Sequence, residues 1–578
     1  MSEAIPVELI ETEQGWQLLR GGEPYFIRGA GGQTSLEELA AAGGNSIRTW
    51  DGFNVRGDED LVVLLDEAHE LGLSVSVGIW LGHERHGFDY DDPEQVKAQF
   101  DRSRDIVMRY KDHPAVLLWG IGNEMEGFDS GDNPAVWQAV NDIAAMVREI
   151  DPHHPTMTTT TFVHGERIDW VHNKMPAIDI HGINAYGGAV VIPQFLDDGG
   201  ATKPYVMTEF GAVGQWEMPK TAWDVPIEQT STDKAAFYER AYNEAILSQP
   251  HRALGGYAFL WGHKMEGTPT WHGMFLADGA PTGPIDTMTR LWSGEPPENL
   301  APRVEPLRID RSAEMDPGTT LKVEVAASDP EGGELTARWT LLPESNDFLT
   351  GGDFRPTPAE IDGVVAESSV ASATIQMPDE PGAYRLYYYV YDEAGKAATA
   401  NLPLLVKGTP RTRLPVAVYD DGFESGPWAP SGWMGNVDAL SVDGNYSGDS
   451  KTGEHSIRIR YEGVYNWAGV AWQHPSGNWG DKDGGYNLEG ASALEFWARG
   501  QYGGERISFG VGLLGADRAF PDSAIEKVDN VDLTDAWTLY RVPLEGADLS
   551  SIKTGFFFSV EGRTSPVTFY LDDIRFIR

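Results

Sequence analysis

The sequence predicts three domains in succession: an N-terminal (β/α)8 barrel, a small β-sandwich and a larger β-sandwich. Residues 1–292 alternate short apolar runs with amphipathic segments, a pattern typical of βα units around a parallel sheet. A Pro-rich connector covers residues 293–302. Residues 303–408 and 414–578 then show strand-like runs separated by turn signals. A length of 578 residues is in keeping with about three domains.

Eight apolar runs predict the strands of a closed barrel. They are Tyr25–Gly29, Asn45–Trp50, Leu73–Leu81, Val116–Glu124, Met157–Thr161, Ile178–Tyr186, Tyr205–Gly211 and Gly256–Gly262. Amphipathic stretches between them predict helices at Ser35–Ala42, Asp58–Leu71, Pro93–Tyr110, Pro134–Ile150 and Thr232–Ser248. A doubly wound open sheet is the competing architecture, but no Gly-rich nucleotide-binding turn follows the first strand. The segment Val7–Phe26 predicts a hairpin that leads into the barrel.

The two later domains are predicted to be all-β. In residues 303–408, turn signals at Asp329–Gly333 and Asp379–Gly382 accompany strand-like runs such as Tyr387–Tyr391. This region resembles immunoglobulin-like or PKD-type sandwiches. Residues 414–578 predict a jelly-roll sandwich. The runs that alternate apolar and polar residues there are Leu494–Arg499, Ile507–Val511, Trp537–Val542 and Thr568–Phe576.

The composition excludes several classes of function. A formal net charge of −44 repels a polyanion along most of the surface, so we expect no nucleic acid partner. The absence of cysteine rules out disulfides and thiolate metal sites. No apolar run approaches the ~18 residues needed to cross a bilayer, so we expect no membrane span. We expect a secreted or periplasmic protein, although residues 1–3 do not resemble a signal peptide.

Two glutamates end two of the apolar runs. Glu124 closes the run Trp119–Glu124, and Glu209 lies in the run Tyr205–Gly211. By the strand count they fall at the ends of strands four and seven, which face one another across the mouth of a barrel. A charge at the end of a buried run is costly unless the protein uses it. An acid and a nucleophile, ~5–5.5 Å apart, are what a retaining glycosidase needs.

The segments around both glutamates resemble the acid/base and nucleophile motifs of glycoside hydrolase clan A. These segments are His113–Glu124 and Val206–Gly211. The resemblance covers about residues 5–290 and is to the barrel of family two, with a secondary likeness to β-1,3-glucanosyltransferases. It implies a retaining mechanism on β-linked sugars, with Glu124 as acid/base and Glu209 as nucleophile.

Further strand-end residues are expected to serve the same site. Asn123 is placed to hydrogen-bond the sugar 2-hydroxyl. Arg48 resembles the clan's arginine after strand two, which keeps the nucleophile ionised, and Tyr186 resembles the tyrosine that bonds the nucleophile. Trp261 is predicted to stack on a sugar face. The alternatives are a surface ion pair for Arg48 and core packing for Tyr186 and Trp261. Other candidates for substrate contact are Trp50, Trp80, His83, His181, Asn184 and Trp271.

The last domain resembles the β-sandwich carbohydrate-binding modules that accompany glucanases. The resemblance is clearest at Ala493–Arg499 and Phe569–Arg575. Exposed aromatic side chains on such a sandwich stack on saccharide rings, whereas core packing is the alternative. The candidates are Trp467, Trp472 and Trp479.

Metal binding is expected only in that last domain. Modules of this kind often hold a structural calcium ion, and solvated carboxylates are the alternative. The candidate ligands are Asp421, Glu424 and Asp573. We expect no cofactor for catalysis, because the pair His83 and His86 has no third ligand at a convincing spacing.

These observations predict a retaining β-glycoside hydrolase that acts on a β-glucan-like polysaccharide or its oligosaccharides. One rival is a β-glucan transglycosylase that uses the same residues. A second rival is a non-catalytic carbohydrate-binding protein, against which the intact pair of glutamates argues. The sugar, the linkage, endo or exo action and the oligomeric state stay open at this point.

Overall fold

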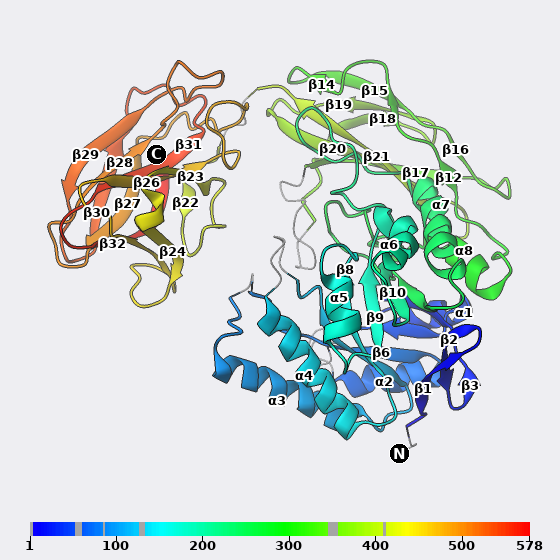
Figure 1. Ribbon diagram of the computed structural model, residues 1–578. Coiled ribbons are helices and arrows are strands. Elements are labelled where there is room, and N and C mark those ends of the chain that lie inside the picture. Colours follow the sequence, from blue (N-terminus) through cyan, green and yellow to red (C-terminus); the bar gives the residue numbers. More distant parts are fainter. Residues whose placement is uncertain (1–3, 52–59, 85–86, 127–132, 345–356, 409–411) are drawn as a thin grey trace. The chain divides into compact units, whose positions relative to one another are not determined.

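The computed structural model describes residues 4–51, 60–84, 87–126, 133–344, 357–408 and 412–578. The chain divides into two compact units. The first consists of Met1–Ala313, Thr320–Gln376 and Ala383–Leu404, and the second of Glu314–Thr319, Met377–Gly382 and Leu405–Arg578. The first unit holds the barrel and most of the middle sandwich, and the second holds the C-terminal sandwich (Figure 1). Among the residues with described coordinates, no helix is both long and apolar enough to cross a membrane.

Eight parallel strands close the predicted barrel, in the order β10-β11-β4-β5-β6-β7-β8-β9. The strands are β4 (Ile27–Gly31), β5 (Ser46–Arg48), β6 (Ser74–Ile79), β7 (Val116–Asn123), β8 (Thr156–Thr161), β9 (Ile180–Asn184), β10 (Tyr205–Phe210) and β11 (Ala253–Ala258). Each overlaps one of the eight predicted runs. Because all strands are parallel, their carboxyl ends meet at one mouth of the barrel.

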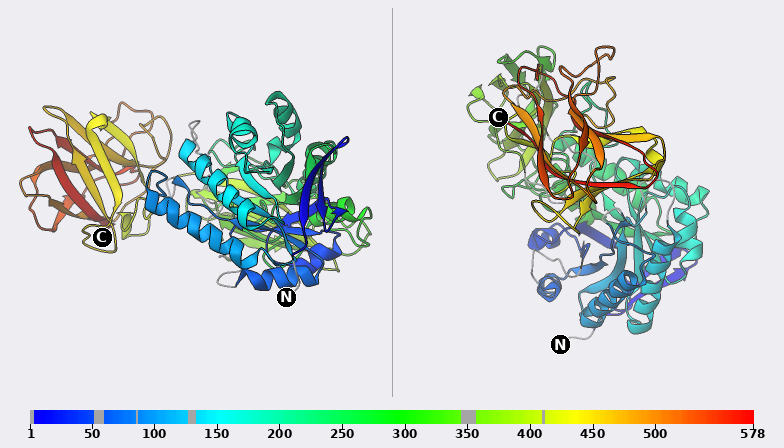
Figure 2. Two further views of the ribbon diagram at one scale, coloured as in Figure 1. Left: turned by 60° about the horizontal axis from the view of Figure 1, so that its bottom comes forward. Right: turned by 90° about the vertical axis from the view of Figure 1, so that its left-hand side faces the viewer.

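Helices surround the strands (Figures 1 and 2). They are α1 (Leu36–Ala41), α2 (Leu61–Glu70), α3 (Pro93–Tyr110), α4 (Pro134–Ile150), α5 (Arg167–Asp169), α6 (Ile192–Asp198), α7 (Ser231–Tyr242) and α8 (Gly283–Ser293). Short irregular helical turns extend this layer at η2 (Trp170–Lys174), η3 (Gly187–Val191) and η4 (Asn243–Leu247). The short helices α5 and α6 lack a full amphipathic repeat, which explains why periodicity did not indicate them.

The long helices begin where the sequence provides caps. The side chains of Asp60, Asp92, Asn133 and Thr230 each accept a hydrogen bond from a backbone N–H in the first turn of α2, α3, α4 and α7 respectively. Pro residues stand at the start of α3 and α4, where no backbone donor is needed. These caps fix where each βα loop ends.

A plug of apolar side chains fills the barrel interior. Its fully buried members include Ile27, Leu118, Met157, Ile180, Val206 and Tyr257. Residues on the opposite faces of the same strands, such as Ile183 and Met207, belong to the outer core against the helices. The alternation of a pleated strand therefore decides which strand residues reach the mouth. Before the first barrel strand, β1 (Val7–Thr12), β2 (Gly15–Arg20) and β3 (Glu23–Pro24) extend the predicted hairpin to three strands.

The middle sandwich consists mainly of two four-stranded sheets. One contains β13 (Arg308–Ile309), β15 (Thr320–Glu324), β19 (Ser372–Gln376) and β18 (Val365–Ser368). The other contains β14 (Glu314–Met315), β21 (Ala397–Val406), β20 (Gly382–Tyr391) and β17 (Thr336–Pro343). A two-stranded ribbon pairs β12 (Arg303–Val304) with β16 (Ala327–Ser328).

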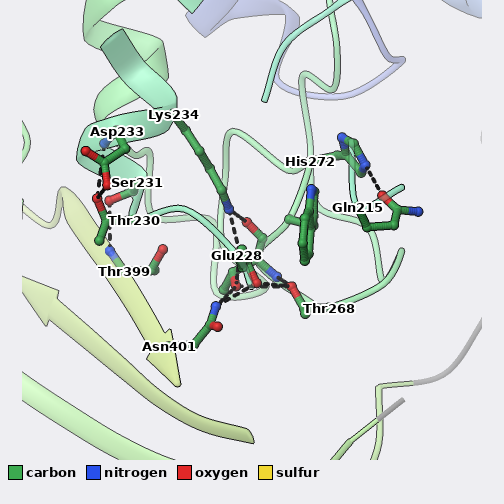
Figure 3. A network of polar contacts seen from close by, with 12 residues as sticks. Gln215, Glu228, Thr230, Ser231, Asp233, Lys234, Thr268, His272, Thr399 and Asn401 are labelled. Carbon is green, nitrogen blue, oxygen red and sulfur yellow. Dashed lines mark hydrogen bonds and ion pairs between the residues drawn. The ribbon is translucent and has the colours of Figure 1, made fainter. Parts of the chain in front are cut away.

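A buried polar network joins the second of these sheets to the barrel (Figure 3). Its centre is Glu228, in the loop between β10 and α7. The Glu228 carboxylate pairs with Lys234 and accepts hydrogen bonds from Thr268, Thr270 and Asn401, the last of which lies in β21. The charges of Lys234 and other neighbours outweigh burial and lower the pKa of Glu228.

Arg385, in β20, adds a second connection. Its guanidinium donates to the Pro226 carbonyl over 2.8 Å and to both oxygens of Glu344 over 3.0 Å. A third Arg385 nitrogen donates to Asn401 Oδ1 over 2.8 Å. The middle sandwich is thus bonded to the loop that follows the strand carrying Glu209.

The C-terminal sandwich packs two antiparallel sheets face to face, drawn in yellow to red in Figures 1 and 2. One sheet contains β24 (Leu440–Tyr446), β25 (Ser456–Tyr461), β32 (Val567–Ile577), β27 (Ala493–Gly500) and β30 (Thr538–Pro543), with β22 (Val416–Tyr419) also paired to β32. The other contains β23 (Ala429–Gly435), β26 (Trp467–Gln473), β31 (Thr554–Glu561), β28 (Arg506–Val511) and β29 (Glu526–Asp532). This arrangement is the predicted larger sandwich.

Candidate active site

Glu209, near the end of β10, is held by three hydrogen-bond donors. The residue is 5% exposed. Arg48 Nη1 and Trp50 Nε1 each donate to Oε1 over 2.9 Å, and the Tyr186 hydroxyl donates to Oε2 over 2.7 Å. A carboxyl group that accepts on both oxygens and faces a guanidinium is in its ionised form. Both oxygens of Glu209 are held in place by side chains of the barrel mouth.

Tyr186, which follows β9, keeps its proton beside this carboxylate. Burial, followed by the charges of Glu209 and Glu266, raises the pKa of Tyr186 well above its usual value. The phenol therefore donates its hydrogen bond throughout the neutral pH range. Of the two sequence interpretations of Tyr186, the geometry matches a hydrogen bond to Glu209.

Arg48, the last residue of β5, connects both strand ends of the site. Its Nη1 also donates to the Thr208 carbonyl over 3.1 Å, and its Nη2 donates to Asn123 Oδ1 over 2.6 Å. The guanidinium carbon lies 5.2 Å from the centre of the Trp50 ring. With 4% of the residue exposed, Arg48 is buried within the site and does not form a surface ion pair.

Glu124 follows β7 in a left-handed backbone conformation, with φ at 54°. This uncommon conformation turns the chain at the strand end, and the Glu124 N–H donates to the Thr159 carbonyl over 2.9 Å. Burial, together with the charges of Glu209 and Glu126, raises the pKa of Glu124 to about 8. A carboxyl group with this pKa is protonated at neutral pH and can act as a general acid.

Asn184, at the end of β9, links the two glutamates. Its Nδ2 donates to Glu124 Oε1 over 2.7 Å and to Asn123 Oδ1 over 3.2 Å. Its Oδ1 accepts from Thr208 Oγ1 over 2.7 Å, one residue before Glu209. The ends of β5, β7, β9 and β10 thus share one hydrogen-bond network.

A third buried carboxyl group, that of Glu126, was not foreseen from the sequence. It bonds the backbone N–H and hydroxyl of Thr161 and lies 3.7 Å from Arg167. Burial raises the pKa of Glu126. It follows the strand in a segment without a periodic pattern, so nothing in the sequence set it apart from a surface glutamate.

Aromatic rings that the prediction omitted surround Tyr186. Phe259, after β11, lies 5.8 Å from the Tyr186 ring and 5.9 Å from the Trp50 ring. His272 lies 5.2 Å from the Tyr186 ring, and burial lowers the pKa of His272 to about 3. The Trp216 ring lies 5.5 Å from the Tyr186 ring. Phe259 lies within the predicted run Gly256–Gly262, in which Trp261 was chosen instead.

The structure places Trp261 and Trp271 in the core and not over the site. Trp261 is 1% exposed, donates to the Ser35 carbonyl over 3.0 Å and packs against Phe275 and Trp292. Trp271 is also 1% exposed and donates to the Val213 carbonyl over 2.8 Å. For Trp261 the geometry matches the core-packing alternative, because the strand end turns its indole toward α8.

His83 and Trp80 lie beside the strand end that carries Glu124. His83 Nε2 is 2.9 Å from the Asn123 carbonyl oxygen, and the His83 and Trp80 rings are 4.9 Å apart. A pocket opens at this point, lined by Trp80, Gly82, His83, Gly87, Phe88 and Gln95. His86 lies outside the described residues.

His181 does not join this group. It lies on the outer face of β9, where Nε2 is 2.9 Å from Thr160 Oγ1 and Nδ1 is 3.0 Å from His172 Nε2. Burial lowers the pKa of His181 well below its usual value. The strand alternation that brings Asn184 to the mouth directs His181 toward the helices.

The three candidate aromatics of the C-terminal sandwich do not form one surface. Trp472 is fully buried, with Phe423, Phe556 and Phe558 around it. Trp479 is half-buried. Trp467 is 45% exposed and follows the 86% exposed Tyr465, so these two rings are available to a ligand.

The three predicted calcium ligands differ in their contacts. Asp421 Oδ1 accepts from the backbone N–H groups of Glu454 and His455, over 2.8 and 2.6 Å. Asp573 pairs with Arg575, and Glu424 is exposed. Within the described ranges, no three His, Cys, Asp or Glu side chains are grouped so that they could hold a metal ion.

The geometry defines a (β/α)8 barrel with a carboxylate pair at its mouth, and comparison with known families agrees with this class. Residues 56–230 match the model of the glycosyl hydrolases family 2 TIM barrel domain, and residues 416–578 match the model of carbohydrate binding domain 30. Two separate stretches of the chain are therefore similar to a family 2 TIM barrel domain and to a carbohydrate-binding domain.

Individual similar proteins share little sequence identity with this chain. Over 174 residues the chain is 26% identical to a probable mannan endo-1,4-beta-mannosidase C of Aspergillus terreus, which covers 27% of this chain and 43% of the relative. The chain thus matches less than half of that curated relative. Similar solved structures include beta-glucuronidase 2 of Bacteroides uniformis, with 13% identity, a TM-score of 0.39 and coverage of 98% of this chain and 67% of that chain. A beta-glucuronidase of Ruminococcus gnavus has 16% identity, a TM-score of 0.39 and coverage of 50% and 53%.

Proposed function

We propose that the chain is a retaining β-glycoside hydrolase that cleaves a β-glucan-like polysaccharide or its oligosaccharides. Glu209 is the nucleophile and Glu124 is the acid/base. The observation that carries this proposal is the contrast between the two carboxyl groups. Glu209 accepts three hydrogen bonds as a carboxylate, whereas the pKa of Glu124 is raised to about 8. Two carboxyl groups with divided roles are what double displacement requires.

In the first step, a Glu209 oxygen attacks the anomeric carbon and the bond from that carbon to the leaving oxygen breaks. Glu124 donates its proton to the leaving oxygen. In the second step, Glu124 takes a proton from water while the water oxygen attacks the anomeric carbon. The bond to Glu209 breaks, and both carboxyl groups return to their starting forms. One water molecule is consumed for each glycosidic bond.

The coupling between the two glutamates supports the change of role in Glu124. The negative charge of Glu209 is one cause of the raised pKa of Glu124. Once Glu209 is esterified to the sugar, it carries no charge, and the pKa of Glu124 falls. Glu124 is then able to act as a base for the second step. Asn123, held by Arg48 over 2.6 Å, is the proposed donor to the sugar 2-hydroxyl.

A β-mannan is the second candidate substrate, because the Aspergillus terreus relative is described as a mannan endo-1,4-beta-mannosidase. The C-terminal sandwich is proposed to bind the same polysaccharide through exposed rings such as Trp467. A polysaccharide is too large to diffuse across a bilayer, so we propose a secreted or periplasmic location for the enzyme.

Product analysis on purified β-glucans and β-mannans tests this function. We expect new reducing ends that are first formed as the β anomer. NMR spectra recorded before mutarotation measure the anomer. Oligosaccharides longer than the substrate at early times would instead favour the transglycosylase. A chain that binds these glycans without cleaving any of them would show the non-catalytic alternative.

A further inference from the structure

The loop after β10 carries an exposed tryptophan, Trp216, next to the tyrosine that bonds the nucleophile. Trp216 is 54% exposed. Its ring meets the Tyr186 ring edge-on, with centroids 5.5 Å apart and planes at 84°. It lies nearly parallel to the His272 ring, with centroids 6.5 Å apart and planes at 28°. Since the Tyr186 hydroxyl bonds Glu209 Oε2, one aromatic ring separates Trp216 from the nucleophile.

Both sequence neighbours of Trp216 fix the loop. The Glu217 carboxylate accepts hydrogen bonds from the backbone N–H groups of Gly187, Gly188 and Gly214, over 2.7, 2.8 and 3.0 Å. Gln215 is 2% exposed, and its Oε1 lies 3.0 Å from His272 Nε2 (Figure 3). The indole of Trp216 is therefore presented from a backbone that is anchored on both sides.

Small residues and an uncharged ring complete this arrangement. A β-carbon at Gly214 would lie 2.6 Å from the Trp216 ring, and one at Gly187 would lie 2.9 Å from the Glu217 carboxylate. Side chains at these two positions would displace Trp216 or its anchor. Burial lowers the pKa of His272 to about 3. The His272 ring next to Trp216 is therefore uncharged at neutral pH.

We propose that Trp216 is a stacking platform for a saccharide ring of the β-linked substrate, bound beside Glu209. The inference rests on the proposed function. An aromatic side chain that is held rigidly and left half exposed offers an apolar plane, and the C–H face of a pyranose ring is its complement. Trp261, which the sequence predicted to be the platform, is buried and cannot stack on a sugar ring.

Kinetic comparison of variants tests the platform. With whichever β-glycan the unaltered chain cleaves, Trp216→Ala is expected to raise KM about tenfold, a typical size for one lost stacking contact, while kcat changes less than about twofold. Trp216→Phe keeps a smaller apolar plane and is expected to raise KM less. Met108→Ala removes a side chain that is 53% exposed on α3 and serves as the matched control with unchanged KM.

An unchanged KM in the Trp216→Ala chain would overturn the platform and leave the proposed hydrolase intact. If the unaltered chain cleaves no β-glycan, the proposed function fails, and binding alone decides the platform. Titration calorimetry with cellohexaose and with mannohexaose then compares the unaltered and Trp216→Ala chains. Loss of one class of binding site in the variant upholds the platform, and identical isotherms overturn it.

Discussion

The carboxyl ends of β7 and β10 each bring a glutamate to the barrel mouth, and the glutamate of β10 forms a direct ion pair with Arg48. Glu209 shares its two oxygens among Arg48, Trp50 and Tyr186. Glu124 accepts a hydrogen bond from the neutral amide of Asn184. Burial and the charges of Glu209 and Glu126 raise its pKa by more than the more distant charge of Arg48 lowers it. The two glutamates thus differ in their affinity for a proton because their surroundings differ. Substitutions that make the surroundings of the two glutamates alike should abolish their separate proposed roles as acid/base and nucleophile.

Removing the β10 carboxylate is expected to have the largest effect. Glu209→Ala eliminates the nucleophile, and kcat should fall roughly 10⁵-fold. Turnover of the best β-glycan from the substrate screen is the measurement. Glu70→Gln, an exposed glutamate at the end of α2, is the control and should be fully active. Unchanged turnover in Glu209→Ala would refute the assignment.

Replacing the acid of β7 is expected to cost less. Glu124→Gln should lower kcat by about 10²–10⁴-fold on a polysaccharide. An aryl glycoside with an acidic phenol needs no proton to leave, so the first step should be nearly unaffected with that substrate. In the unaltered chain activity should fall as pH rises through about 8, because Glu124 then loses the proton it must donate. Persistence of this alkaline limb in the variant would assign it to another group.

Removing the positive charge of Arg48 tests the surroundings of Glu209. Arg48→Met leaves Glu209 as a buried carboxylate without its cation, which is expected to lower the free energy of unfolding by about 3–5 kcal/mol. Chemical denaturation measures this loss. Adding Glu209→Gln to the same chain removes the unpaired charge and should restore much of the stability. A double variant no more stable than Arg48→Met would show that the guanidinium acts through its other contacts.

A smaller effect is expected from Tyr186→Phe, which removes one hydrogen bond to an ionised group. Such a bond is worth about 1.5–3 kcal/mol, so kcat/KM should fall roughly 10- to 100-fold. Thermal unfolding of the variant should remain close to that of the unaltered chain, since the ring still packs against Phe259 and His272. A loss of stability in proportion to activity would indicate a structural role instead.

A further expected effect concerns the pH dependence of stability. The pKa of Glu124 lies near 8 in the folded chain against 4.5 in the unfolded one. As pH rises from 4.5 to 8 the unfolded chain releases this proton first, so folding loses stability across that window. Glu124→Gln has no such proton. Its Tm relative to the unaltered chain should therefore increase steadily from pH 4 to pH 8, and a constant difference would contradict the raised pKa.

The strand count predicted which candidate residues lie together at the barrel mouth. Both glutamates, Arg48, Asn123 and Tyr186 were placed by strand ends, because parallel strands deliver their carboxyl ends to one mouth. Residues beyond the strands were harder to place. Trp216 lies in a loop whose path depends on the contacts of Glu217 with backbone groups 30 residues away in sequence, and no local pattern reveals such contacts.

Aromatic side chains were the main source of error. Trp261 and Trp472 occur in strand-like runs, where a platform and a core residue have the same sequence pattern. The structure buries both. His181 illustrates a related limit, since a shift of one residue along β9 separates the mouth from the helix layer. Which tryptophan is exposed depends on tertiary packing.

The buried network around Glu228 has a consequence for dissecting this protein. A chain cut at the Pro-rich connector would expose Glu228 and Lys234 after removing Asn401 and Arg385, the partners supplied by the middle sandwich. The Glu228 carboxylate and the Pro226 carbonyl would each lose a hydrogen-bond donor, and an unsatisfied polar group of this kind is destabilising. The shortest autonomous catalytic fragment should therefore extend through β21, and the connector at residues 293–302, despite its composition, is a poor place to end an expression clone.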